Sequence, residues 1–189
     1  MRQIRQGVFE TNSSSVHAIC IATNPSEDSI HKMPIEPDFR DFGWEWDIHR
    51  NAQTKAEYAL TALFDSHSHD RDFVIEKVKE FRSWLKEENL LYDKYWGKLG
   101  DAYFGETLYG AVDYPEYGAR WHLPEGIYGI DHGSGTREFV DYVFANKERM
   151  CNFLFSDESF VQTGNDNEDY SGINLKDIKY DHEIFEKWN

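Results

Sequence analysis

Cysteine and long apolar runs are scarce in this sequence of 189 residues, and each scarcity argues against particular classes of protein. The two cysteines, Cys20 and Cys151, lie in apolar segments and lack the spacing of metal ligands, which favours buried thiols. The N-terminus opens with two arginines but has no apolar stretch after them, so we expect neither a signal peptide nor a membrane span. A reducing, cytoplasmic location is the resulting expectation.

Basic residues are also scarce. The chain has 20 Lys and Arg against 35 Asp and Glu, which gives a formal net charge of -15. Such a chain repels bare nucleic acid unless its cations are locally concentrated, so direct nucleic-acid binding is not expected. A positively charged surface, including one that normally holds nucleic acid, is the kind of partner that this charge suits. The alternative is that the acidity serves solubility alone.

Aromatic residues are abundant, at 16% of the chain. Thirteen Phe, eleven Tyr and six Trp can fill a core even though the mean hydropathy is -0.73. Disordered chains are poor in these residue types, so the composition favours a folded protein. The length suits one domain over residues 1–189, with no internal repeat.

The strands are predicted from alternating or continuous apolar patterns. Val8 and Phe9 end a first strand, and residues 16–23 form a second after a polar bend at 11–14. Within the second strand, one face carries His17, Ile19 and Ile21, and the other carries Ala18, Cys20 and Ala22. Residues 24–40, with three prolines, form an irregular connection, and residues 42–48 read as a further strand.

Apolar side chains at helical spacing predict the helices. One helix covers 54–64, and a clearer one carries the stripe Val74, Val78, Phe81 and Leu85 with a cap at Asp70 or Asp72. Residues 89–130 suggest irregular structure with short strands. A further helix follows residue 136, strands cover 152–155 and 159–163 around a turn at 157–158, and a short helix ends the chain at 184–188. The predicted fold class is α+β, with a mixed or antiparallel sheet and three to four helices.

The strongest candidate site is the polar block that precedes and enters the second strand. Ser13, Ser15 and His17 alternate along an extended chain and therefore share one face, so they are the candidate catalytic residues. A histidine beside a serine can activate it as a nucleophile, or act alone as general acid or base. Asn12 and Ser14 add polar groups for binding a phosphate or sugar, and Arg5 adds a cation for an anionic substrate. The alternative is a polar turn whose hydroxyls bond to local backbone.

A second candidate is the glycine-rich loop at 131–137, which leads into a predicted helix. Backbone N–H groups at such a helix start can bind an anion, and His132 and Ser134 are the candidate substrate-binding side chains. The spacing matches neither a Walker A loop nor a dinucleotide-binding fingerprint. An ordinary helix entry capped by Ser134 or Thr136 is the alternative.

Two further segments carry possible metal ligands. His67 and His69 have a spacing that suits zinc with a third carboxylate, but they lie between two predicted helices, where polar and capping residues are expected in any case, and a capped linker is the favoured interpretation. The acidic loop at 165–169 offers oxygen ligands but lacks the glycine and the final glutamate of an EF-hand. The sequence therefore assigns no metal and no cofactor, and it leaves the oligomeric state open.

The polar block resembles a string shared by short proteins of phages, prophages and other bacterial mobile elements. The matching residues here are Arg5, Gly7, Phe9, Glu10, Thr11, Asn12, Ser13, Ser14, Ser15 and His17. A second, weaker shared motif covers 163–167. The resemblance spans about a tenth of the chain and brings no settled activity. It implies a mobile-element protein in the cytoplasm of a bacterial host, and accessory proteins of that origin often antagonise host defences.

Two functions are therefore expected as alternatives. The first is an accessory protein that inhibits a bacterial defence protein or ribonucleoprotein with a basic surface, such as an anti-CRISPR protein acting on a guide-RNA nuclease. The second is an enzyme that acts on a phosphate-bearing nucleotide or RNA through Ser13, Ser15 and His17. A structural role in a virion is a third reading.

Overall fold

The computed structural model describes residues 15–36, 40–43, 46–67, 70–92, 109–114, 118–123, 126–127, 130, 136–165 and 173–187. The predicted first strand at Val8 and Phe9 and the bend at 11–14 lie outside these residues, as do the loop at 131–135 and most of the acidic loop at 165–169.

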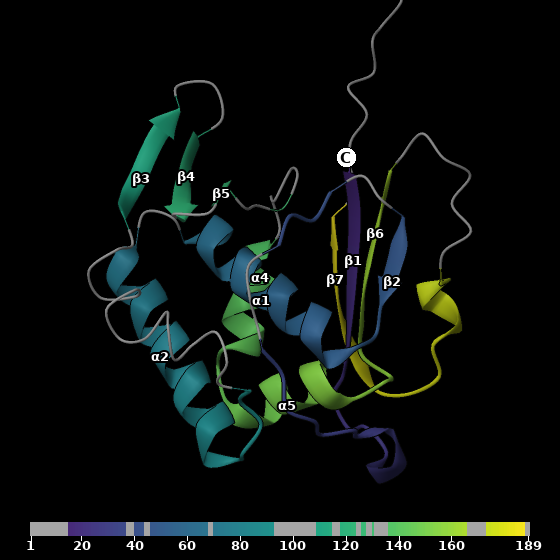
Figure 1. Ribbon diagram of the computed structural model, residues 1–189. Coiled ribbons are helices and arrows are strands. Elements are labelled where there is room, and N and C mark those ends of the chain that lie inside the picture. Colours follow the sequence, from purple (N-terminus) through teal and green to yellow (C-terminus); the bar gives the residue numbers. More distant parts are fainter. Residues whose placement is uncertain are drawn as a thin grey trace, which may run out of the picture.

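A four-stranded antiparallel sheet forms the centre of the fold, in the order β2-β6-β1-β7 (Figure 1). The strands are β1 (Ser15–Ala22), β2 (Asp47–His49), β6 (Phe160–Asn165) and β7 (His182–Lys187). From His17 to Cys20, β1 pairs with β6 on one side and with β7 on the other, so it is a central strand. The strand predicted at 16–23 is confirmed.

Helices cover one face of this sheet, and the described residues contain four of them. They are α1 (Ala52–Ser66), α2 (Arg71–Glu87), α4 (Thr136–Val143) and α5 (Lys147–Phe155). Helices α1, α4 and α5 contact the sheet, whereas α2 packs outside them (Figure 1). Two short 3-10 helices, η1 (Glu27–Ser29) and η2 (Leu175–Asp177), lie in the connections. The predicted α+β class with an antiparallel sheet is confirmed.

A small second sheet, in the order β3-β4-β5, stands apart from the first (Figure 1). Its strands are β3 (Tyr109–Tyr114), β4 (Gly118–Leu123) and β5 (Gly126–Ile127). The short strands expected between 89 and 130 are therefore present.

Helix α1 is buried on nearly all sides because it packs against α4, α5 and α2 as well as the sheet. Asn51 caps its start by accepting a hydrogen bond from the Thr54 backbone N–H at 2.8 Å. Alanines at four positions let neighbouring elements approach closely. They are Ala52, Ala56, Ala59 and Ala62. The sequence predicted one apolar face for this helix, but the structure buries Lys55 and Tyr58 as well.

The two faces of β1 alternate as predicted. Ile19 and Ile21 belong to the core under the helices, whereas Cys20 faces the other side, where its thiol lies 4.0 Å from the Tyr180 hydroxyl. Burial raises the pKa of the Cys20 thiol to about 11. The predicted buried thiol is confirmed for Cys20, whereas Cys151 is half-buried.

Three predicted elements differ from the structure. The segment 152–155 was expected to be a strand, but it is the last turn of α5. The C-terminal segment around Ile184 and Phe185 was expected to be a helix, but it is strand β7. The strand expected over 42–48 is shorter, because only Asp47–His49 joins the sheet and Phe42 makes a single bridge to Ile130.

No helix among the described residues is both long enough and apolar enough to span a membrane.

Candidate functional site

His17 lies on the helix-facing side of β1 and is only 4% exposed. Its Nδ1 lies 3.3 Å from the hydroxyl oxygen of Tyr58, a fully buried residue of α1. Which of the two atoms donates this hydrogen bond depends on the histidine tautomer. Because so little of His17 reaches solvent, a dissolved substrate can contact the ring only after the protein around it changes conformation.

Polar residues form a row across the sheet at the level of His17. The register places His17 opposite Thr163 of β6, and Thr163 opposite Asp47 of β2. Thr163 is buried, whereas the Asp47 side chain is 60% exposed. Asp47 Oδ2 also lies 3.3 Å from Nδ1 of His49, on the same strand face. The row thus runs from a buried imidazole to an exposed carboxylate, which are groups suited to proton transfer.

Aromatic rings pack around Tyr58, the hydrogen-bonding partner of His17. The Tyr58 ring makes edge contacts with Phe42 and Phe139, with centroid distances of 4.9 and 5.7 Å. Burial raises the pKa of the Tyr58 hydroxyl well above its usual range, and burial lowers the pKa of His49 despite the nearby Asp47 carboxylate. Tyr58 therefore stays a neutral hydrogen-bonding partner of His17.

Almost all of the other residues predicted to lie around His17 are outside the described residues. Ser15 is described by its backbone alone, two positions before His17 on β1 and opposite Asn165. The remaining predicted residues of the two anion-site candidates lie outside the described residues. They are Arg5, Asn12, Ser13, Ser14, His132 and Ser134. That Ser13 shares one face with Ser15 and His17 therefore stays a prediction.

His67 directly follows α1 as its C-cap residue and makes a Ser–His–Asp chain of contacts. Its Nδ1 lies 2.8 Å from the Ser66 hydroxyl, and its Nε2 lies 3.7 Å from Asp141 Oδ1 of α4. The Ser66 hydroxyl itself donates to the Ala62 carbonyl at 2.7 Å, and the imidazole stacks on the Phe73 ring. Burial lowers the pKa of His67. The serine hydroxyl is thus committed to its own helix, as helical serines often are.

His69, one of the two histidines with zinc-ligand spacing, and the loop at 166–169 lie outside the described residues. Within the described part of the chain, no group of three or more His, Cys, Asp or Glu side chains is arranged to hold a metal ion. Either metal hypothesis from the sequence therefore stays open.

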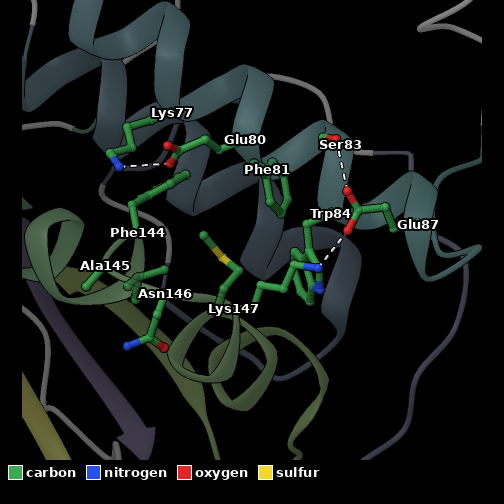
Figure 2. A pocket seen from close by; sticks show the side chains of 12 residues that line it. Lys77, Glu80, Phe81, Ser83, Trp84, Glu87, Phe144, Ala145, Asn146 and Lys147 are labelled. Atoms are coloured by element: carbon green, nitrogen blue, oxygen red, sulfur yellow. Dashed lines mark hydrogen bonds and ion pairs between the residues drawn. The ribbon is translucent and has the colours of Figure 1, made fainter.

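A groove of about 340 Å³ lies between α2 and the corner that joins α4 to α5 (Figure 2). Its floor is apolar and includes Phe81, Trp84 and Phe144, while two ion pairs stand at its rim. Lys77 pairs with Glu80 at 2.8 Å, and Lys147 pairs with Glu87 at 2.7 Å. Clefts of this size lie at the lower end of the range for ligand sites.

Sequence patterns alone give little sign that Tyr58 and Asp47 lie near His17 or that a groove forms beside α2. Tyr58 is one aromatic residue among many, and its contact with His17 joins residues 41 positions apart. Asp47 carries no signal in the sequence beyond its place in the strand predicted at 42–48. The clearest available signal was the stripe on α2, since Phe81 belongs to it and also forms the groove floor.

Comparison with known proteins gives no further assignment: no family model, no curated protein and no solved structure matches the chain.

Proposed function

We propose that this chain is a phage or mobile-element accessory protein that inhibits a bacterial defence complex, as an anti-CRISPR protein does to a guide-RNA nuclease. The observation that carries the proposal is the surplus of acidic residues, 35 against 20 basic ones. Most acidic side chains of the described residues are exposed, on helices, strands and loops alike. A chain of this charge is attracted to a nuclease channel that is positively charged in order to hold nucleic acid.

The N-terminal string from Arg5 to His17 adds the second support, since it resembles proteins of mobile elements. The proposed setting is the cytoplasm of a bacterial host, and the proposed partner is a protein or ribonucleoprotein with a basic surface.

Co-purification with guide-RNA nucleases and other defence effectors tests this function, together with a phage-challenge assay. Because opposite charges attract, we expect a complex at about 0.1 M salt, where the Debye length is about 10 Å. The complex should weaken at about 1 M salt, where the Debye length is about 3 Å. Cells that carry the chain should lose protection against phage. If no effector forms a complex and protection is unchanged, the proposal is wrong.

A second function is an enzyme that acts on a phosphate-bearing nucleotide or RNA. The observation that favours it is the row containing His17, Thr163 and Asp47, which begins where the predicted Ser13–Ser15 block enters β1. His17→Ala separates the two functions. An inhibitor that acts through its surface keeps its activity in this variant if the fold survives, whereas an enzyme that uses His17 loses turnover.

A further inference from the structure

The groove beside α2 combines an apolar floor with two carboxylates on the same helix. Glu80 and Glu87 are seven residues apart on α2, which places them two turns apart on one face, about 10 Å along the helix axis. Both are more than half exposed, at 54% and 59%. Trp84 lies between them in sequence, and its ring is almost entirely buried in the floor.

The two lysines at the rim are arranged less regularly. Lys77 is on α2 and Lys147 is on α5, on opposite walls of the groove (Figure 2). Lys77 is only 21% exposed, and its ammonium also lies 5.8 Å from the centre of the Phe73 ring. The two carboxylates thus come from one helix, two turns apart, whereas the two lysines come from different helices.

Exchange of the present ion pairs requires little free energy. Ion pairs at a protein surface contribute little to stability in general, and the Glu80 and Glu87 carboxylates are both more than half exposed. Glu87 also accepts a hydrogen bond from the Ser83 hydroxyl at 3.3 Å, and the bond from Lys147 holds its pKa below the ordinary value. Glu87 therefore stays ionised at neutral pH and can accept a cation from another molecule in place of Lys147.

We propose that this groove is a docking site for an amphipathic helix of a basic protein partner. One apolar side chain of that helix enters the space above Phe81, Trp84 and Phe144. Lys or Arg side chains two turns apart on the helix reach Glu80 and Glu87. This is the general mode in which helices bind grooves, with apolar anchors flanked by matching charges. The inference rests on the proposed function for the basic character of the partner, and it adds where that partner binds.

The test uses the full chain and a synthetic amphipathic helix of about 18 residues, long enough to form a helix, with leucines on one face and lysines seven apart. Fluorescence anisotropy of the labelled peptide gives its Kd. We expect Ala145→Trp, which puts a bulky ring into the groove from an exposed position, to weaken binding at least about tenfold. Ser83→Trp obstructs the groove from the other wall and serves if the first variant fails to fold.

Charge is tested by reversal at matched positions. We expect E80K/E87K to weaken the basic peptide at least about tenfold. E27K/D177K makes the same change in net charge on the two 3-10 helices, outside the groove, and should have a much smaller effect. Lys79→Trp, on an exposed position of α2 that does not line the groove, controls for the added ring.

Three results would overturn the inference. They are equal weakening by the control variants, unchanged binding in both Trp variants of the groove, and tighter binding of a peptide whose lysines are replaced by glutamates. Failure here is separable from failure of the proposed function. If the chain inhibits a defence effector and A145W inhibits it equally well, the groove inference fails alone.

Discussion

Lys55 is the residue whose position departs furthest from what its side chain ordinarily prefers. It lies on α1 with no exposed surface, and its ammonium nitrogen donates to the carbonyls of Ser156 and Ser159 at 2.6 and 3.0 Å. Desolvation, with a smaller contribution from the Arg50 cation, lowers its pKa from 10.5 to about 7. A neutral amine has two N–H groups, which matches the two carbonyls that it contacts.

This burial predicts a particular dependence of stability on pH. Between about pH 7 and 10.5 the unfolded chain holds a proton on Lys55 that the folded chain lacks, so the free energy of unfolding rises with pH. The slope contributed by Lys55 approaches about 1.4 kcal/mol per pH unit. Urea denaturation between about pH 7.5 and 8.5 measures it, below the range where the ionisation of Cys20 in the unfolded chain opposes the trend.

Lys55→Met should flatten the slope in that range, since it removes the titrating group. Lys32→Met is the matched control, because the Lys32 side chain is 45% exposed, and it should leave the slope unchanged. A parental slope of zero, or an equal slope in Lys55→Met, would show that Lys55 stays protonated in the folded protein.

Tyr58 and His17 offer a second prediction at this scale. Tyr58→Phe removes the hydroxyl that lies 3.3 Å from His17 Nδ1 and changes little else in the packing. We expect a loss of about 1–2 kcal/mol in the free energy of unfolding, which is the usual effect of deleting one partner of a buried hydrogen bond. Tyr92→Phe, at a position 55% exposed, should change stability by less than about 0.5 kcal/mol. Equal stability of the two variants would mean that the His17 contact does not stabilise the fold.

At the scale of elements, the N-terminal cap of α1 has a measurable role because this helix joins the sheet to α2. Asn51→Ala removes the acceptor for the Thr54 N–H and should lower the free energy of unfolding by about 1 kcal/mol. Asn51→Asp retains an oxygen acceptor and should stay close to the parental stability. Chemical denaturation at one pH compares the three chains, and similar losses in both variants would contradict a capping role.

Helices with an apolar stripe and a recognisable cap could be predicted from sequence. The spacing of Val74, Val78, Phe81 and Leu85 located α2, and Asp70 does accept a hydrogen bond from the Phe73 N–H. The true start signal of α5 was missed. Asn146 caps it through the Arg149 N–H, and Met150, Phe153 and Leu154 then follow at helical spacing. Without this cap, residues 152–155 are only a short apolar run, and such a run suits a strand as well as a helix.

Strand β7 shows why elements that depend on pairing between distant segments could not be predicted from the local sequence. Ile184 and Phe185 are adjacent apolar residues, a pattern that does not alternate as a half-exposed strand does. They point to opposite faces of the sheet, and both are partly buried. Their backbone pairs with Cys20 and Ile19, more than 160 positions earlier in the chain. A long separation in sequence also hid Thr163 from the site prediction, because only the register with β1 brings it beside His17.

For the whole molecule, the net charge of -15 predicts that salt stabilises the fold. A large charge of one sign destabilises a compact state by self-repulsion, and salt screens that repulsion. Salt also weakens attractive surface pairs such as Lys32–Glu88, but each of these contributes at most about 1 kcal/mol. Repulsion among the uncompensated carboxylates is therefore the larger effect.

Thermal unfolding in increasing NaCl measures this balance. We expect the unfolding temperature to rise by about 2–4 °C, the change that roughly 1 kcal/mol produces in a protein of this size. Most of the rise should occur below about 0.2 M, because the Debye length is already about 8 Å at 0.15 M, whereas salting-out effects continue to grow at higher concentration. E27K/D177K makes the net charge less negative and should show a smaller rise. A fall in unfolding temperature over this range would mean that the charges are arranged in attractive networks. The proposal that an acidic surface binds a basic partner would then lose its support.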